Sequence, residues 1–317
     1  MNLKNSTPPI VSVIIVSFNT RKLTVKSIKS VYASKGFKSG EIEVIVVDNN
    51  SSDDTIDFIG KKFSNFRLIA NRENRGYGGG NNQGALIAKG KYLLLLNTDA
   101  FLGKDSLRTL VDVLEKHDDI VSVGPQLRYA DDRVQLSGGY LPTPMRVMAW
   151  MWWLDKLPLV KLFFSTPYHV FDPAWHKKPQ YPDWLMGACV LFRRDEFLSA
   201  GGFDEKIFMY AEEVELYRRL LDPKVQKSLP RRRRVYFTPK AKVVHLGRAS
   251  SNKANAFVLI QELKGIEYIY LKHYPHLLWF VRSVIFIGVL IRIIVFSLIP
   301  SRHNTLVEYK KFFERAK

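Results

Sequence analysis

The residues best suited to chemistry are Asn97-Thr98-Asp99, a polar step directly after the apolar run 92–96. A strand that is buried on both faces reads as a continuous apolar run, so 92–96 predicts a central strand. Open α/β sheets bind ligands at the carboxyl ends of such strands. A carboxylate there can hold a hard divalent cation, which in turn neutralises a diphosphate. Asp99 is therefore the first candidate for a metal ligand.

Two further polar steps end the first two predicted strands. Ser17-Phe18-Asn19 follows the apolar stretch that begins at Val11, and Asp48 closes the stretch 41–48. Both steps lie at the carboxyl ends of their strands, as Asp99 does. An Asp in that position either forms a turn with its own backbone or accepts a hydrogen bond from a nucleotide base or ribose. The sequence leaves both interpretations of Asp48 open.

A glycine-rich segment, 74–82, follows the third predicted strand. Glycines let backbone amides approach a phosphate, and the start of a helix adds positive potential. The segment follows the third strand rather than the first, and Asn81 stands where the dinucleotide-binding fingerprint needs its last glycine. The pattern thus argues against a nicotinamide or flavin site and leaves a phosphate-binding loop as the functional interpretation.

Downstream acids form a second candidate group. Glu212 and Glu213 lie near the start of a predicted helix, where acids also complement the helix dipole. A carboxylate beside a metal-bound diphosphate can instead deprotonate an acceptor hydroxyl as a general base. His245 ends an apolar strand and is either structural or a metal ligand through its neutral imidazole. Arg248 and Lys253, which follow it, are candidate phosphate ligands.

An alternation of strands and helices positions these residues. Repeated β–α units favour a mostly parallel, Rossmann-like sheet with right-handed crossovers and helices on both sides. Hydrophobic periodicity predicts strands at 11–17, 41–48, 66–70, 91–96 and 120–123 and helices at 21–33, 55–62, 81–89 and 106–116. Beyond residue 125 the rhythm weakens, and the pattern predicts a strand at 185–192, helices at 195–200 and 208–221, and strand segments at 235–245.

The chain divides into three regions by pattern. Residues 1–125 carry the regular β–α units, 126–250 are rich in large apolar groups, and 251–317 read as helical. Aromatic faces suit sugars and lipids, but they also fill cores. The tryptophans of the middle region therefore form either an apolar acceptor surface or part of the core: Trp150, Trp152, Trp153 and Trp184.

Composition narrows the partners and the compartment. The 317 residues include 48 Lys and Arg against 30 Asp and Glu, and the net charge of +18 favours an anionic partner. No recognition helix or aromatic–basic strand pattern supports a nucleic acid as that partner.

The single cysteine, Cys189, lies in an apolar run and reads as a core residue in a reducing compartment. The polar N-terminus lacks a signal-peptide core, so we expect a cytoplasmic protein.

The segment 277–299 is the most apolar of the chain and contains Arg282 and Arg292. Insertion contributes about −0.3 to −0.6 kcal/mol for each large apolar residue, against about +2.5 to +3.5 kcal/mol for each central arginine, so spanning is marginal. On a helix the two arginines fall about 80° apart. One polar sector favours a helix that lies in the headgroup zone, and a spanning helix and a buried core helix are the alternatives.

Taken together, these pieces resemble the family 2 inverting glycosyltransferases of GT-A fold over roughly residues 10–250. Each motif is modest, and their joint order and spacing carry the resemblance. It is greatest to the rhamnosyltransferase branch, which extends lipid-linked or cell-surface glycans. The matching segments are 13–19, 46–53, 71–81, 97–99, 187–189, 201–205, 212–213 and 244–245.

The resemblance implies roles for these residues. Residues 1–125 would bind the nucleotide sugar, 126–250 would bind the acceptor and carry the base, and 251–317 would associate with the membrane. Asp99 and His245 would hold Mg²⁺ or Mn²⁺ on the diphosphate of a dTDP- or UDP-linked sugar. The residues expected to line the nucleotide pocket are Ser17, Asn19, Asp48, Asn74, Gly76, Asn97 and Thr98, and those expected to contact the acceptor are Trp184 and Gly187.

Two residues depart from the family pattern. Asn97 replaces the first acid of the metal motif, and Glu213 stands where Asp is usual, which leaves Glu212 as an alternative base. The hypothesis is a single displacement that inverts the anomeric centre. The acceptor is expected to be a glycan or a sugar linked to a polyprenyl diphosphate or a similar membrane anchor. We expect the protein at the cytoplasmic face of the membrane, peripheral or monotopic. The alternative is a non-catalytic, membrane-associated module that binds nucleotide or glycan.

Overall fold

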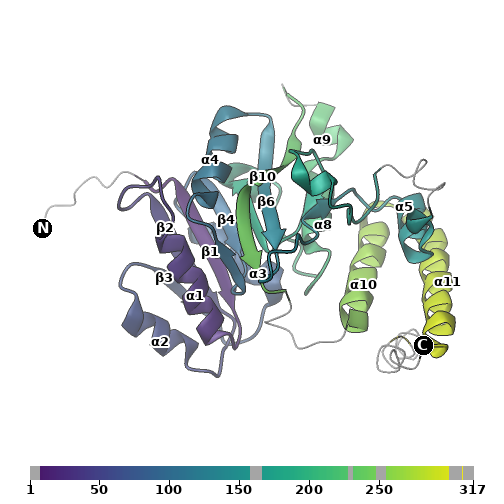
Figure 1. Ribbon diagram of the computed structural model, residues 1–317, viewed down its shortest axis with the longest axis horizontal. Helices are drawn as coiled ribbons and strands as arrows, with labels where there is room; N and C mark the ends of the chain where they lie inside the picture. Colours follow the sequence, from purple (N-terminus) through teal and green to yellow (C-terminus); the bar gives the residue numbers. More distant parts are fainter. Residues whose placement is uncertain (1–7, 158–165, 228–230, 248–254, 300–308, 310–317) are drawn as a thin grey trace, which may run out of the picture.

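The computed structural model describes residues 8–157, 166–227, 231–247, 255–299 and 309. Arg248 and Lys253, the candidate phosphate ligands, lie outside the described residues. An eight-stranded mixed sheet in the order β3-β2-β1-β4-β9-β6-β10-β5 forms the centre of the molecule (Figure 1). Its strands are β1 Val11–Ser17, β2 Ile42–Asp48, β3 Arg67–Ala70, β4 Tyr92–Leu96, β5 Ala100–Leu102, β6 Ile120–Arg128, β9 Cys189–Arg193 and β10 Arg234–His245. A small second sheet pairs β7 Gly138–Gly139 with β8 Trp184–Leu185.

Helices cover both faces of the large sheet. One buried cluster joins the sheet to α1 Arg21–Tyr32, α2 Thr55–Lys62 and α4 Ser106–Lys116. A second buried cluster contains side chains of α3 Gly76–Ile87, α5 Pro144–Met151, α7 Arg194–Ser199, α8 Glu212–Leu220, α10 Asn255–His273 and α11 Leu278–Ser297. Within it, α11 packs against α5 and α10. The short α9, Pro223–Lys227, follows α8. α10 and α11 extend away from the sheet at the end of the molecule opposite the N-terminus (Figure 1).

The first half of the sheet follows the sequence-based expectation, and the second half adds two antiparallel strands to it. β1 pairs in parallel with β2 and β4, β2 with β3, and β6 with β10. However, β9 lies antiparallel between β4 and β6, and β5 lies antiparallel to β10, so the largely parallel sheet is mixed. Apolar runs reveal a buried strand but carry no information on its direction. The division expected at residue 125 falls inside β6, so both halves share one sheet.

The glycine-rich segment is helical from Gly76, whereas the sequence analysis placed the start of the helix at residue 81. Close packing explains this difference. A Cβ on Gly80 would lie 2.7 Å from the Val16 side chain, and one on Gly84 would lie 2.6 Å from the Ile14 side chain. The glycines therefore let α3 approach β1 closely, at a cost in helix propensity that packing offsets.

This close approach predicts a contrast between two glycine-to-alanine substitutions. Gly84→Ala should destabilise the protein by about 1–3 kcal/mol, because the new methyl overpacks against Ile14. Gly60→Ala in α2 meets nothing within 4 Å and should stabilise the protein by about 0.5–1 kcal/mol through helix propensity. Urea unfolding of both variants measures the two changes, and equal effects would contradict the packing argument.

The C-terminal helix α11 turns one arginine toward the protein. Arg292 is 4% exposed; its guanidinium donates to backbone carbonyls of Met151 and Trp150 in α5 and lies 4.8 Å from the Trp153 ring. Arg282 pairs with Glu267 of α10 at 3.7 Å. The expectation that both arginines face headgroups is therefore wrong for Arg292.

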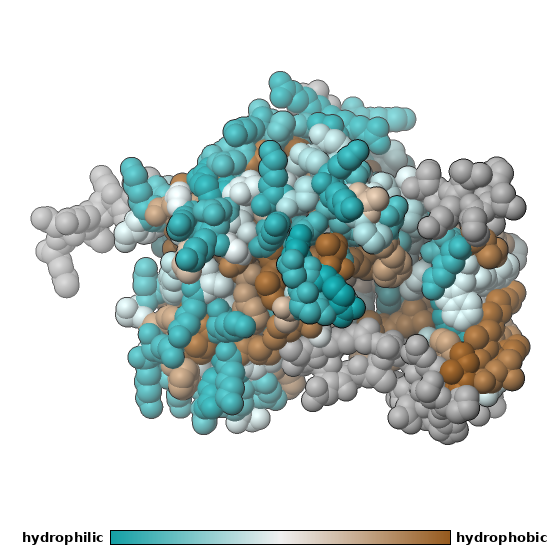
Figure 2. Space-filling model, viewed as in Figure 1, coloured by the Kyte–Doolittle hydropathy of each residue, from teal (hydrophilic) through white to brown (hydrophobic). Residues whose placement is uncertain are grey.

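The outward face of α11 is apolar instead. Figure 2 shows hydrophobic residues gathered at the end of the molecule where α11 lies. The stretch Pro275–Ser297 is long and apolar enough to cross a membrane, and only 33% of its most hydrophobic window is buried inside the protein, which weakens the core-helix alternative. The exposed side chains are Trp279, Phe286, Ile287, Leu290, Ile294 and Leu298.

Candidate active site

Sheet pairing brings Asp99 and His245 together. β5 begins directly after Asp99 and pairs antiparallel with the end of β10, so that Ala100 lies opposite His245. The His245 Nε2 lies 3.4 Å from the Asp99 Oδ1, and the Leu246 N–H donates to the Asp99 carbonyl at 3.0 Å. Two residues that are 146 positions apart in the chain thus share one end of the sheet.

A hydrogen bond fixes which histidine nitrogen faces Asp99. The His245 Nδ1 lies 2.9 Å from the Gln135 Oε1, and the Gln135 amide donates to the His245 carbonyl at 2.5 Å. Because an amide oxygen only accepts, we assign the proton of the neutral ring to Nδ1. The lone pair of Nε2 is then directed toward Asp99.

Among the side chains of this site, the Asp99 carboxylate gives the strongest indication of a bound ligand. It is 1% exposed, and neither of its oxygens has a hydrogen-bond partner among the described residues. A buried carboxylate without partners is costly, so such groups usually bind an ion or a substrate. The oxygens of Asp99 and the free nitrogen of His245 form a donor set that suits Mg²⁺ or Mn²⁺. Within the described residues no cluster of three or more such side chains occurs.

Asp48 lies at the same end of the sheet as Asp99. Asp48 ends β2, whereas Asp99 lies three residues beyond the end of β4 and directly precedes β5, which pairs with β10. The Asp48 carboxylate is buried and accepts from the Ser51 N–H at 2.8 Å and the Ser51 hydroxyl at 2.7 Å. The turn interpretation of Asp48 is therefore confirmed, and its role in binding a base stays a prediction.

The loops that follow β1 and β2 are bonded to each other. Asn19 has a φ of 54°, and its Oδ1 accepts from the Ser52 N–H at 2.7 Å. Its own N–H donates to the Ser51 hydroxyl at 2.9 Å. The Ser17 hydroxyl is buried beside Thr20 and Thr24, so this side chain holds the strand–helix connection.

An amide network supports the start of α3. The Asn49 side chain donates to the Asn74 Oδ1 at 3.2 Å and to the Gly76 carbonyl at 2.9 Å, and Asn74 in turn accepts from the Gly76 N–H at 2.9 Å. Asn71 bonds both Asn49 and Gln83. The sequence analysis found Asn74 and Gly76 but missed these supporting amides, although the Asn-rich composition of both loops could have indicated them.

The backbone around Asn97 connects the two candidate groups. The Asn97 N–H donates to the Ala188 carbonyl at 2.9 Å, and the Asn97 carbonyl accepts from Ala100 at 3.1 Å. Thr98 is 4% exposed. One residue before Ala188, the Gly187 N–H lies 3.5 Å from the Glu213 Oε1. Asn97, in the polar step after β4, is therefore linked to Glu213 through hydrogen bonds of the segment 187–188.

Two buried carboxyl groups begin α8. Glu212 and Glu213 each have one carboxylate oxygen that is buried without a partner. The Tyr77 hydroxyl donates to the Gly187 carbonyl at 2.6 Å, and this ring lies where a Cβ on Gly187 would come within 3.0 Å. Gly187 is thus packed between Tyr77 and Glu213, as an acceptor-side residue at the base would be.

Burial shifts the ionisation of both acids. Burial raises the pKa of Glu213 to about 7, and the negative charge of Glu262 adds to this shift. Burial, followed by the charge of Glu213, raises the pKa of Glu212 well above its ordinary value. A general base works best with a pKa near the operating pH. The raised pKa of Glu213 suits this role, and the choice between Glu213 and Glu212 as the base stays a prediction.

The backbone before these acids is held in an uncommon conformation. Tyr210 and Ala211 have φ values of 69° and 70°, which are left-handed for residues other than glycine. Such a conformation costs about 1–3 kcal/mol for each residue and is concentrated at functional sites. It also explains why α8 begins at Glu212 rather than at residue 208, as periodicity had indicated.

Trp184 belongs to a buried aromatic cluster. It is 3% exposed, and its indole N–H donates to the Tyr168 carbonyl at 3.1 Å. Its ring lies 5.5 Å from that of His169, which stacks on Tyr168 at 4.2 Å. Trp184 therefore contributes to the core rather than to an exposed acceptor surface. The sequence analysis missed His169 and its partner Glu262, which no pattern in the sequence connects.

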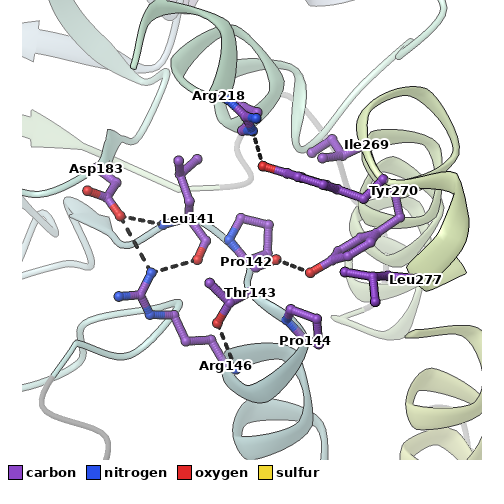
Figure 3. Close-up of a pocket in the computed structure, with 11 residues that line it drawn as sticks. Leu141, Pro142, Thr143, Pro144, Arg146, Asp183, Arg218, Ile269, Tyr270 and Leu277 are labelled. Atoms are coloured by element: carbon purple, nitrogen blue, oxygen red, sulfur yellow. Dashed lines mark hydrogen bonds and ion pairs between the residues drawn. The ribbon is translucent and has the colours of Figure 1, made fainter. Parts of the chain in front are cut away.

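A separate cavity of about 320 Å³ lies between the loop before α5 and the helices α8 and α10 (Figure 3). Its polar side chains are largely paired with one another, as Arg146 is with Asp183 at 3.5 Å. None of the residues predicted for the site lines this cavity. It is therefore distinct from the Asp99 and Glu213 groups.

The sheet order and its polar edge are those of the GT-A fold. The solved mannosyltransferase PcManGT from Pyrobaculum calidifontis, in complex with GDP-Man and Mn²⁺, has a TM-score of 0.54 at 15% identity and covers 98% of this chain and 77% of its own. GalNAc-T7 with UDP, GalNAc and Mn²⁺ has a TM-score of 0.55 at 16% identity, over 84% of this chain and 50% of its own. At these identities the likeness shows the fold alone.

The chain belongs to glycosyl transferase family 2, whose sequence profile matches residues 12–179, more than half of the chain. The N-acetylglucosaminyl-diphospho-decaprenol L-rhamnosyltransferase of Mycobacterium tuberculosis is 28% identical over 201 residues, which are 56% of this chain and 61% of that protein. The hexosyltransferase Agl10 of Haloferax volcanii is 26% identical over 66% of this chain and 60% of its own length. The match thus spans about three fifths of these curated relatives.

Proposed function

We propose that the protein is an inverting glycosyltransferase that moves a sugar from a nucleoside diphosphate to a glycan or lipid-linked acceptor. The observation that carries this proposal is the buried, unpartnered carboxylate of Asp99 beside His245, with Glu213 connected to it through the segment 187–188. The carboxylates of Asp99 and Glu213 favour this proposal over a non-catalytic binding module, although Asn97 stands in place of the first acid of the family's metal motif.

The donor would lie along the carboxyl ends of β1, β2 and β4. Asp48 would face the base, and the start of α3 would lie near the phosphates, where its N-terminal dipole favours negative charge. Asp99 and His245 would hold a divalent metal, which when bound neutralises the departing diphosphate. Two fold relatives bind Mn²⁺ together with a nucleotide or a nucleotide sugar, which supports this arrangement.

Glu213 would act as the general base. Its carboxylate is positioned by the Gly187 N–H, and its pKa of about 7 leaves a large fraction ionised at neutral pH. It would remove the proton from an acceptor hydroxyl as that oxygen attacks the anomeric carbon, while the bond from this carbon to the diphosphate breaks on the opposite face. One displacement inverts the configuration and needs no covalent intermediate.

The acceptor would be anchored to a membrane. The Mycobacterium tuberculosis relative is named for a decaprenol-linked acceptor and for rhamnose, which supports a lipid-linked acceptor and a rhamnosyl donor here. The apolar outward face of α11 and the net charge of +18 both favour a surface of anionic lipid. We place the protein at the cytoplasmic face, where nucleotide sugars are available.

This membrane contact predicts the effect of charges on α11. The double variant Ile287→Glu/Ile294→Glu should lower binding to phosphatidylglycerol-containing vesicles by about tenfold or more, because each buried apolar side chain contributes about 1.5–3 kcal/mol. Phe58→Glu in α2, at another exposed apolar position, is the matched control and should bind as the unchanged protein does. Sedimentation with vesicles measures both, and an unchanged double variant would reject α11 as the contact.

Product formation tests the function directly. The protein is incubated with Mn²⁺, dTDP- or UDP-linked sugars and a short-chain polyprenyl-diphosphate acceptor, and NMR gives the anomeric configuration of the product. The proposal predicts release of nucleoside diphosphate and an inverted linkage with at least one donor. Donor binding without any turnover across the panel would favour the binding module instead.

A further inference from the structure

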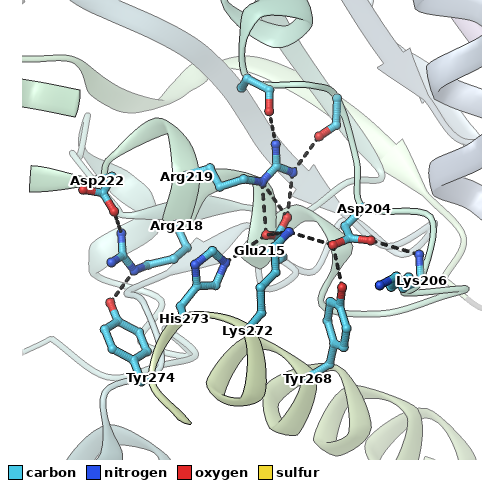
Figure 4. Close-up of polar contacts among 12 residues, drawn as sticks. Asp204, Lys206, Glu215, Arg218, Arg219, Asp222, Tyr268, Lys272, His273 and Tyr274 are labelled. Carbon is cyan, nitrogen blue, oxygen red and sulfur yellow. Dashed lines mark hydrogen bonds and ion pairs between the residues drawn. The ribbon is translucent and has the colours of Figure 1, made fainter. Parts of the chain in front are cut away.

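A buried polar cluster fixes α10 against α8. The Glu215 carboxylate is fully buried and contacts Arg219 at 2.6 Å, Lys272 at 2.8 Å and His273 at 3.0 Å (Figure 4). Burial alone would raise the pKa of Glu215, but the hydrogen bonds and charges of these three partners outweigh it and lower that pKa. A buried, fully paired carboxylate of this kind specifies one arrangement of the two helices.

Two further contacts extend this attachment of α10. Asp204, which precedes α8, accepts from the Tyr268 hydroxyl at 2.8 Å and from Lys272 at 2.7 Å. Gly265 precedes Tyr268 in α10. A Cβ on Gly265 would lie 2.6 Å from the Ala211 Cβ and 2.8 Å from the Tyr210 carbonyl oxygen. α10 therefore passes directly over the strained residues that begin α8.

This packing brings Glu262, three residues before Gly265, to the catalytic acids. The Glu262 carboxylate accepts from the Tyr168 hydroxyl at 2.8 Å and lies 2.8 Å from the His169 Nε2. Its side chain is 16% exposed, so its charge is poorly screened. Glu262 is close enough to raise the pKa of both Glu212 and Glu213.

We propose that Glu262 is a positioning residue of the catalytic centre, where it orients Tyr168 and His169 and places a third negative charge beside Glu212 and Glu213. This inference rests on the proposed function, because it assigns α10 a part in setting the ionisation of the base. The interaction with Glu262 raises the pKa of Glu213, and the interaction with His169 lowers it. Contacts made by one buried pair, Glu262 and His169, thus act on the base in opposite directions.

The other ionisable groups around Glu213 come from three elements. Tyr77 of α3 and Tyr217 of α8 interact electrostatically with Glu213, and so does Tyr168. Burial raises the pKa of each of these tyrosines well above its ordinary value, so they stay neutral across the working pH range. Glu212, Glu262 and His169 are therefore the remaining groups whose interactions with Glu213 add to the effect of burial.

The test is the pH profile of kcat/KM for transfer in the full-length protein. Glu262→Gln keeps the hydrogen-bond acceptor and removes the charge, so the acidic limb should move down by about one pH unit. At pH 6 the variant should then retain about five times more of its plateau activity than the unchanged protein. His169→Gln removes the interaction that lowers the pKa of Glu213 and should move the limb in the other direction.

Glu267→Gln is the matched control, because this acid lies on the same helix and pairs with Arg282 instead. Its profile should equal that of the unchanged protein. A Glu262→Gln variant with lower activity but an unshifted limb would overturn the proposal, since a purely structural role changes the rate and not the pH dependence.

If the unchanged protein shows no transfer at all, the proposed function fails rather than this inference. In that case the melting temperature still tests it: the loss between pH 5.5 and 8.5 should be smaller for Glu262→Gln than for the unchanged protein.

Discussion

Glu213→Gln should reduce the rate of sugar transfer by about 10²–10⁴-fold while leaving donor binding intact. The amide keeps the shape of the side chain and its acceptor for the Gly187 N–H, but it cannot take a proton. Turnover is measured as release of nucleoside diphosphate in the presence of acceptor. Donor binding is measured separately by the shift in melting temperature.

Two comparisons make this result specific. Glu212→Gln should retain more activity than Glu213→Gln, because it is the Glu213 carboxylate that contacts the Gly187 N–H, beside the segment that is bonded to Asn97. Glu115→Gln, at an exposed acid of α4 that pairs with Arg108, should retain full activity. Loss of transfer in the Glu212 variant alone would move the base role to that residue.

Stability should change with pH in a direction set by Glu213. Its pKa is raised from 4.5 to about 7 in the folded protein, so the protonated form is the one that folding favours. The associated stability is present below pH 4.5 and is lost as the pH rises through 7. The Glu213→Gln variant lacks this loss, so its melting temperature should fall less than that of the unchanged protein between pH 5 and pH 8.

Asp99→Asn should abolish the stabilisation that a nucleoside diphosphate gives in the presence of Mn²⁺. A ligand at 100 times its Kd raises the free energy of unfolding by about 2.7 kcal/mol, and this gain should disappear with the carboxylate charge. Without ligand the variant should be at least as stable as the unchanged protein, because a buried carboxylate without partners has been neutralised. Thermal unfolding with and without nucleotide and Mn²⁺ measures both effects.

Asp112→Asn is the control for Asp99→Asn, since Asp112 lies on α4 and pairs with Arg108 at the surface. It should keep the full ligand-dependent shift. His245→Gln should reduce the shift less than Asp99→Asn does, because histidine contributes one neutral nitrogen and no negative charge. An Asp99→Asn variant that is stabilised as strongly as the control would remove Asp99 from the binding site.

The parallel half of the fold was predictable because β1, β2 and β4 are largely buried and α1, α2 and α4 are amphipathic. The predicted bounds of β1 and α2 agree with the structure, as do those of α4. The direction of β9 was not predictable, because a buried strand has the same composition whether it runs parallel or antiparallel. The start of α3 was missed because its glycines serve close packing, a tertiary effect that helix propensity does not contain.

From the sequence, only those residues of the site that lie at the ends of strands were predictable. Asp99 follows β4, and pairing of β5 with β10 brings His245 to it, which the resemblance to the family had implied. Glu262 and His169 were not predictable, because α10 reaches α8 through contacts between Gly265 and Ala211 that leave no mark on hydrophobic periodicity. The inward direction of Arg292 was missed because periodicity defines a polar sector but not what it faces.

The central claim is that residues far apart in the chain surround one donor site. A crystal structure of the protein with a nucleoside diphosphate and Mn²⁺, with the metal located by its anomalous scattering, tests this most directly. We predict that the metal lies within ligand distance of Asp99 and His245 and that the nucleotide base lies beside Asp48. The Glu213 carboxylate should face the space beyond the diphosphate. Nucleotide and metal bound elsewhere, with the Asp99 carboxylate still buried and unliganded, would contradict it.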